Sequence, residues 1–292
     1  MTISNKQGND LPVTAPSPKS LILNLLLAAD GDPLEASDAV LASSLFGIRE
    51  NSVRVALVRL GAAGLLASSG RGAYQLGPAA ANLADELSSW RSAEVRTIPW
   101  TGDWLMVCTA ELGRSDRKAL RVRDRALALM GMKPLNDALH VRPANLLGGA
   151  ADARDRLQRL GLPAQAPVFI ARDLDTALDS RARSLWDGQG LTQAYRRTHQ
   201  RLDAWLARSH DLDAETAARE SYLLGNEAIR QLVFDPLLPE PLVDTQARRA
   251  FTEAVVAFDR AGHDIWRRLL QHLPARGKHS KDAHDPKRHT TH

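Results

Sequence analysis

The stretch that decides the fold is IRENSVRVALVRLGAAGLLASSGRGAYQL, residues 48–76. Its apolar residues recur at helical spacing, which predicts a helix that begins after Ile48 and ends at Gly64, since glycine commonly terminates helices. Residues 65–76 then form two short extended runs on either side of a Gly-Arg-Gly turn centred on Arg71. This pattern predicts a two-stranded hairpin with an arginine at its tip.

The predicted helix has two different faces when its residues are spaced at about 100°. The face predicted to pack in a core carries Val53, Ala56, Leu57, Leu60 and Gly64. The opposite face carries Asn51, Ser52, Arg54, Val55, Val58 and Arg59. A merely solvated face usually carries paired Glu and Lys, whereas the only acid here is Glu50.

The residue types on the free face suit contact with DNA. Arg and Asn can make bidentate contacts with guanine and adenine, Ser can reach a phosphate, and a small apolar group can touch a thymine methyl. The alternative is a solvent-facing helix that is basic without a ligand. We predict a DNA-reading surface composed of Arg49, Asn51, Ser52, Arg54, Val55 and Arg59, with Arg71 in the hairpin.

The segments before this stretch complete a recognisable pattern. Residues 19–29 and about 37–45 have helical spacing, so three helices precede the hairpin. That order predicts a winged helix-turn-helix domain over residues 19–90, closed by a linking helix in residues 78–90. Residues 1–18 are polar, contain three prolines and lack periodicity, so we expect them to be disordered.

The rest of the chain divides into two further blocks and a tail. Residues 98–173 read as strand, helix, strand, helix, strand, which predicts a ferredoxin-like domain. Residues 174–273 read as a helical domain. Its last helix has an apolar stripe that could be core or a dimer seam, made of Phe251, Val255, Phe258, Gly262, Ile265 and Leu269. Residues 274–292 form a basic tail expected to be disordered, and the fold class is α+β, mostly helical.

Composition excludes several classes of protein. There is no run of 18 apolar residues to span a membrane and no apolar core of a secretory signal, so we expect a cytoplasmic protein. The single Cys108 excludes an internal disulfide framework, and its apolar neighbours predict a buried thiol. The net charge is +4, but residues 1–90 carry 6 basic and 8 acidic residues. Only the local pattern on the third helix therefore supports DNA binding.

Several sequence blocks, in order and spacing, resemble the PaaX-type phenylacetate-catabolism repressors over most of residues 19–272. They are ENSVRVALVRLGAAGLL, GRGAYQLG, TGDWLMVC, RKALRVRDRALALMGMKPLNDALHVRP, LWDGQGLTQAYRR and VFDPLLPEPL. The resemblance implies a central domain similar to the Cas2 nuclease fold and a homodimer bound to a double-stranded DNA operator. It also implies repression of an aromatic-acid pathway that an aryl-acyl-CoA effector relieves.

Two groups of residues are candidates for binding such an effector. Arg121 and Arg125 lie one turn apart on an arginine-rich helix and suit phosphate recognition, of either DNA or the pyrophosphate of a CoA thioester. The alternative is a basic face that only meets solvent. Trp104, Trp186 and Tyr195, together with Trp100, suit an aromatic acyl pocket, although such residues more often fill a core.

Two other classes of function compete with DNA-binding regulation. A metal-dependent nuclease of Cas2 type needs a carboxylate at the end of the first strand, but Asp103 stands before that strand. Phosphate-loop, G-x-S-x-G and HExxH motifs are missing from the sequence, so we expect no catalytic residues, no metal site and no cofactor. The second rival is a protein-interaction module that uses the winged helix. Salt dependence distinguishes it from DNA binding.

Overall fold

The computed structural model describes residues 15–29, 31–80, 89–113 and 115–272. Most of the two terminal segments predicted to be disordered, and much of the predicted linking helix, lie outside these ranges. At the N-terminal end the first helix begins at Pro18, and the Ser17 side chain accepts a hydrogen bond from the Ser20 amide. Helical structure therefore starts within the segment predicted to be disordered.

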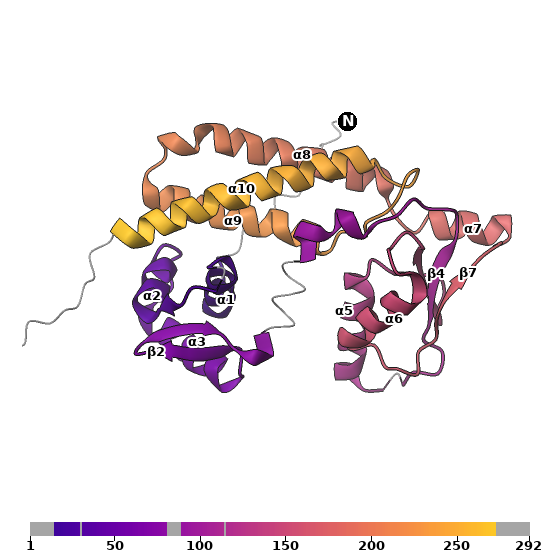
Figure 1. Ribbon diagram of the computed structural model, residues 1–292, viewed down its shortest axis with the longest axis horizontal. Helices are drawn as coiled ribbons and strands as arrows, with labels where there is room; N and C mark the ends of the chain where they lie inside the picture. Colours follow the sequence, from indigo (N-terminus) through magenta and orange to yellow (C-terminus); the bar gives the residue numbers. More distant parts are fainter. Residues whose placement is uncertain (1–14, 30, 81–88, 114, 273–292) are drawn as a thin grey trace, which may run out of the picture.

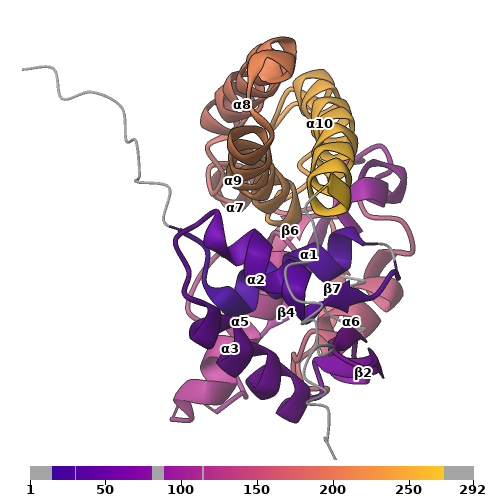
Figure 2. The same ribbon diagram turned by 90° about the vertical axis from the view of Figure 1, so that its left-hand side faces the viewer.

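The described chain is mostly helical and carries two small antiparallel sheets, as the predicted fold class requires. Figure 1 shows three long helices lying side by side along one edge of the molecule. They are α8 (Gly188–Arg208), α9 (Ala214–Val233) and α10 (Thr245–His272). The N-terminal block lies against one end of these helices and the central sheet lies near the other (Figure 1). Figure 2, viewed from the N-terminal side, shows the N-terminal helices beneath the ends of α9 and α10.

The N-terminal block contains three helices and a three-stranded antiparallel sheet of order β1-β3-β2. Its elements are α1 (Pro18–Ala28), β1 (Leu34–Glu35), α2 (Ala36–Ser44), α3 (Glu50–Ala62), β2 (Leu66–Gly70), β3 (Ala73–Leu76) and the short η1 (Pro78–Ala80). The three helices and the hairpin agree with the prediction, whereas β1 was not predicted. Gly64 has φ +68°, a backbone conformation that favours glycine, and it lies just past the end of α3 as expected.

The central block contains four strands rather than the three predicted. Its elements are η2 (Ser89–Ser92), η3 (Glu94–Arg96), β4 (Trp104–Cys108), α5 (Arg117–Leu129), β5 (Lys133–Pro134), β6 (Leu139–Pro143), α6 (Gly149–Arg159) and β7 (Val168–Ala171). All pairs are antiparallel in the order β5-β6-β4-β7. The prediction missed β5 because two residues, one of them proline, carry no alternating pattern. Cys108 is only half-buried, so the prediction of a buried thiol was wrong.

Alternation along β4 explains how the central sheet is covered on both faces. Successive side chains of a strand point to opposite faces. Leu105 and Val107 belong to a buried cluster with residues of α5 and α6. Trp104 and Met106 belong instead to a cluster shared with the C-terminal helices. The central sheet and the C-terminal block, predicted as separate domains, therefore share one core.

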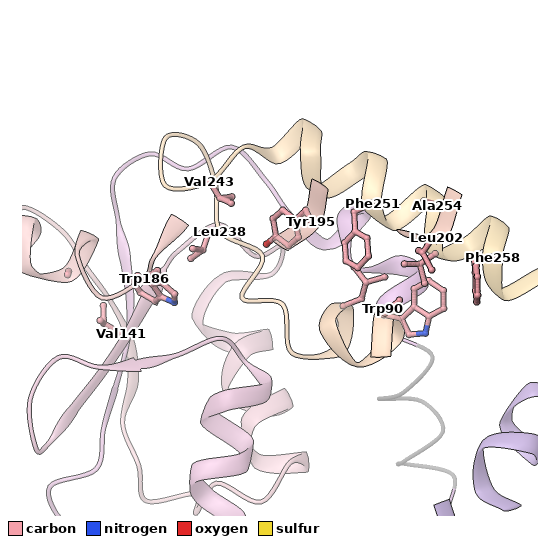
Figure 3. Close-up of a cluster of buried hydrophobic side chains, with 14 of the residues drawn as sticks. Trp90, Val141, Trp186, Tyr195, Leu202, Leu238, Val243, Phe251, Ala254 and Phe258 are labelled. Atoms are coloured by element: carbon pink, nitrogen blue, oxygen red, sulfur yellow. The ribbon is translucent and has the colours of Figure 1, made fainter. Parts of the chain in front are cut away.

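The C-terminal block adds α7 (Thr176–Arg183) and the short η4 (Ser209–Asp211) to the three long helices. The first half of the α10 stripe is core, because Phe251, Val255 and Phe258 are buried in the cluster that also holds residues of α8 and α9. Figure 3 shows this cluster extending from Val141 and Trp186 beside the central sheet to Phe258 along α10. These three residues are therefore not available to a dimer seam.

Candidate nucleic-acid interface

Helix α3 is anchored by the side chains that its periodicity assigned to the core. Val53, Leu57 and Leu60 are buried in a cluster with residues of α1 and α2. On the opposite side Val55 and Val58 are 41% and 71% exposed, among the most exposed large apolar side chains. Isolated exposed valines cost little, but two on one helix turn leave an apolar strip facing solvent. The angular assignment of the two faces is confirmed.

The polar residues predicted to read DNA surround this apolar strip. Asn51, Arg54 and Arg59 are exposed, and Ser52 is half-buried. Arg49 is exposed at the position that caps the helix N-terminus, and its side chain makes no capping hydrogen bond. Figure 1 shows α3 at the edge of the molecule opposite α8 and α10, so the C-terminal helices do not cover it.

Glu50 is a member of this surface whose pairing was not predicted. Its Oε1 accepts hydrogen bonds from Arg54 Nε at 2.8 Å and Arg54 Nη2 at 2.6 Å. The signal was present in the sequence, since the two residues are four apart on one helix. Val58 also belongs to the surface by its exposure, although it was not among the residues assigned to DNA reading.

The hairpin holds Arg71 in an exposed turn between β2 and β3. Gly70 and Gly72 on either side have φ values of +141° and +82°, which side chains other than glycine rarely adopt. The Gly72 carbonyl accepts a hydrogen bond of 2.9 Å from the Ala36 amide at the start of α2. The hairpin tip is therefore fixed to the helical part of the block. Among the described residues Arg49, Arg59 and Arg71 form no ion pair, so their charges face solvent.

The aromatic residues considered for an effector pocket lie in the core. Trp104, Trp186 and Tyr195 are all buried in the shared cluster (Figure 3). Trp104 stacks on Trp186 at 6.1 Å between ring centroids, and its Nε1 donates to Asp179 Oδ1 at 2.9 Å. Tyr195 stacks on Phe251 at 5.9 Å. Packing thus accounts for the position of all three.

The arginines considered for the effector lie elsewhere. Arg121 and Arg125 are exposed on α5, and Arg117 one turn earlier is exposed as well. Their spacing places all three on one side of the helix. The buried aromatic cluster and these exposed arginines do not form one continuous site in this conformation, because the aromatic side chains have almost no accessible surface.

The structure also places side chains of the first and last blocks together, which the sequence did not indicate. Asn24 on α1 donates to the Tyr222 hydroxyl at 3.0 Å, and Phe46 packs edge-on against the same tyrosine at 5.1 Å. Trp266 and Leu269 near the end of α10 are buried in the cluster of the N-terminal block. The helix that presents the candidate surface therefore rests, through α1, on α9 and α10.

The described residues were also inspected for metal sites and membrane spans. Asp103, the carboxylate nearest to β4, accepts a hydrogen bond of 3.0 Å from Arg172. In the ranges that the structure describes, three or more His, Cys, Asp or Glu side chains never gather as a metal site would require. No described helix is both long and apolar enough to cross a bilayer.

Comparisons with known proteins bear on this surface and on the C-terminal helices. Residues 17–80 match the family model described as PaaX-like protein, and residues 186–268 match that of the PaaX-like protein C-terminal domain. The solved structure of the uncharacterized protein Rv0674 from Mycobacterium tuberculosis is 25% identical to this chain, with a TM-score of 0.55. That match covers 87% of this chain and 99% of the other. None of the curated proteins matches the chain significantly.

Proposed function

Since this chain belongs to the PaaX-like family, we propose that it is a DNA-binding transcriptional regulator, a repressor of an aromatic-acid catabolic pathway of phenylacetate type. The observation that carries the proposal is the free face of α3. It combines exposed Arg54, Arg59 and Asn51 with an apolar strip, and the neighbouring hairpin adds Arg71. That set contains side chains for phosphate, for base edges and for thymine methyls.

We further propose a winged helix-turn-helix for residues 19–90 and a Cas2-like ferredoxin domain for residues 98–173. Three helices followed by an antiparallel hairpin support the first assignment. The strand order β5-β6-β4-β7, with one helix between β4 and β5 and another between β6 and β7, supports the second. In this assignment α3 enters the major groove and Arg71 contacts the phosphate backbone nearby.

The repressor binds its operator as a homodimer in this proposal. Two copies of α3 then read half-sites about 10 bp apart, or a multiple of that spacing. Because Phe251, Val255 and Phe258 are buried within one chain, the dimer contact has to lie on other surfaces.

The test is selection of binding sites from random double-stranded DNA with the full chain. Fluorescence anisotropy of the selected site at several salt concentrations then gives the affinity. We expect an enriched motif with two half-sites, and an affinity that falls linearly with salt on logarithmic axes. A chain that enriches no motif and does not retain DNA even at low salt is not a DNA-binding regulator.

The effector in this proposal is an aryl-acyl-CoA that releases the repressor from DNA. Exposed Arg121 and Arg125 are its proposed phosphate contacts. An aryl site lined by Trp104, Trp186 and Tyr195 requires the buried cluster to open. A ligand present at about 100 times its dissociation constant stabilises the fold by about 2.7 kcal/mol, which a thermal shift detects. If aryl-CoA thioesters produce neither a thermal shift nor release from DNA, the effector assignment fails while DNA binding stands.

A further inference from the structure

Arg142 at the end of β6 is a buried cation whose hydrogen-bond acceptors are all uncharged. Its Nε donates to the Pro143 carbonyl at 3.2 Å, and its Nη1 donates to the Met130 carbonyl. Its Nη2 donates to Asn145 Oδ1 at 3.0 Å and to the Pro236 carbonyl at 3.1 Å. Buried charges in proteins are normally paired with an opposite charge. Among the described residues no carboxylate is hydrogen-bonded to this guanidinium.

The charges around Arg142 are mostly of the same sign. Burial and then the charge of Arg156 lower the pKa of the Arg142 guanidinium to about 9, and Arg248 and Arg96 act in the same direction. Asp235 opposes them, but burial raises the pKa of the Asp235 carboxyl itself. The Asp235 Oδ2 also lacks the geometry of a hydrogen bond to any described group, although the Tyr195 hydroxyl is close enough to lower its pKa. The region is therefore short of negative charge.

A small cavity of about 20 Å³ lies beside these groups. Its lining includes Arg96, Arg142, Arg156 and Asp235, with Trp90 on the apolar side. Both Arg96 and Arg156 also interact with other groups of the protein, which fixes them beside the cavity. A volume of this size admits a group of only a few atoms. Guanidinium groups match the planar fork of an oxyanion, so the lining suits a phosphate or a carboxylate group.

The cavity lies where three segments of the chain meet. Residues 90–96 lead into the central block, β6 and α6 belong to that block, and residues 232–237 end α9 and continue toward α10. Asn145 Nδ2 donates to the Leu237 carbonyl at 2.7 Å, so the same polar group ties the central block to this connection. A ligand here touches both the central and the C-terminal blocks.

We infer that this junction is a binding site for a small oxyanion, held by Arg142 and Arg156 with Arg96 beside them. The occupant is either free inorganic phosphate or the phosphate or carboxylate end of a larger molecule that projects from the cavity. The inference goes beyond the proposed function and does not depend on DNA binding. It names a site that is separate from the exposed arginines of α5.

Inorganic phosphate and phenyl phosphate are the probes, titrated into the full-length protein at constant ionic strength. Isothermal calorimetry gives the dissociation constant, and the melting temperature is followed in parallel. We expect saturable binding with a rising melting temperature. Binding of inorganic phosphate alone identifies a free ion as occupant, and binding of both probes identifies the end of a larger ligand. If neither probe binds saturably, the inference is overturned.

Two glutamine variants on α6 locate the site. Arg156→Gln removes a cavity-lining guanidinium and should weaken phosphate binding about tenfold, the usual effect of losing a hydrogen bond to a charged group. Arg159→Gln removes the same charge from an exposed position on the same helix and should bind as the unaltered protein does. Equal affinity in all three proteins would place phosphate binding elsewhere and overturn the assignment. Each variant is compared with its own phosphate-free baseline, so a change in its stability does not obscure the result.

Discussion

Arg54 and Glu50 form an ion pair along the exposed face of α3, with 2.6 Å between Arg54 Nη2 and Glu50 Oε1. Both side chains are more than half exposed. Such a pair one helix turn apart contributes only about 0.3–0.5 kcal/mol. A bidentate contact between arginine and a base is worth about 1–3 kcal/mol of discrimination. Arg54 can therefore leave Glu50 for a base at small cost, and until then the pair keeps its guanidinium on the free face.

Replacement of Arg54 tests whether α3 reads bases. Arg54→Ala should cost about 1–3 kcal/mol of binding free energy on the selected site and relax the preference at one base pair. Competition assays against single-base variants of the site measure both effects. Arg197→Ala removes an exposed arginine from α8 and serves as the control. An equal loss on every sequence would show that Arg54 contacts phosphate rather than a base.

Arg71 should behave differently because a hairpin tip reaches the DNA backbone. Arg71→Ala should weaken binding to all sequences alike and reduce the slope of affinity against salt by about one, the release of one counterion. Anisotropy titrations at four or more salt concentrations give this slope. A slope equal to that of the unaltered protein would contradict a contact between the hairpin and phosphate.

The ion pair between Arg248 and Glu94 should matter much more for stability than an exposed pair. Arg248 Nε lies 2.7 Å from Glu94 Oε1, and the two side chains are only 3% and 21% exposed. Burial alone would lower the pKa of Arg248, but hydrogen bonds to Glu94 and its charge outweigh this and raise it. Glu94→Gln leaves a buried charge uncompensated and should cost about 3–5 kcal/mol of unfolding free energy. Denaturant unfolding measures the loss.

The matched control for that change is Glu227→Gln. Glu227 pairs with Arg201 at 2.7 Å, but both side chains are 47% exposed. Exposed pairs contribute about 0–1 kcal/mol, so this variant should unfold almost as the original protein does. Similar losses in the two variants would mean that burial does not set the strength of the Glu94 pair.

Trp266 should anchor the N-terminal block on α10. It is buried in the cluster of that block and packs edge-on against Tyr222 at 6.4 Å. Trp266→Ala removes a large buried side chain and should cost about 3–5 kcal/mol. Hydrogen exchange should quicken in α1 and α2 before it quickens in the central sheet. Val58→Ala, at an exposed position, should stay within about 0.5 kcal/mol. Uniform quickening across all three blocks would contradict a local anchor.

His140 should make stability depend on pH below neutrality. Burial, and then the charge of Arg123, lower the pKa of this imidazole from 6.5, while Asp124 opposes them. A lowered folded pKa means that the neutral form stabilises the fold. That contribution is present above pH 6.5 and is lost as the pH falls through the lower folded pKa. Melting temperatures from pH 8 to pH 5 should fall less in His140→Gln, and parallel profiles for the two proteins would refute the assignment.

The sequence by itself determined the features that depend on neighbouring residues. The period of α3 assigned Val53, Leu57 and Leu60 to the core and left Arg54 and Val58 outside, and the structure agrees. The glycine after α3 marked its end because only a left-handed residue fits there. Such patterns are set by helix geometry within a few residues, and they do not change with the surroundings.

Only the tertiary structure decided which groups meet across the chain. It placed the stripe that begins at Phe251 in the core rather than in a seam, and it buried Trp104 and Tyr195 in the same cluster. It also brought Arg142 beside Asp235, which lies 93 positions further along the chain, and rested the N-terminal block on Trp266. A helical period records that a face is apolar but not what covers it. The covering partner depends on how distant segments close on one another, and no local pattern encodes that.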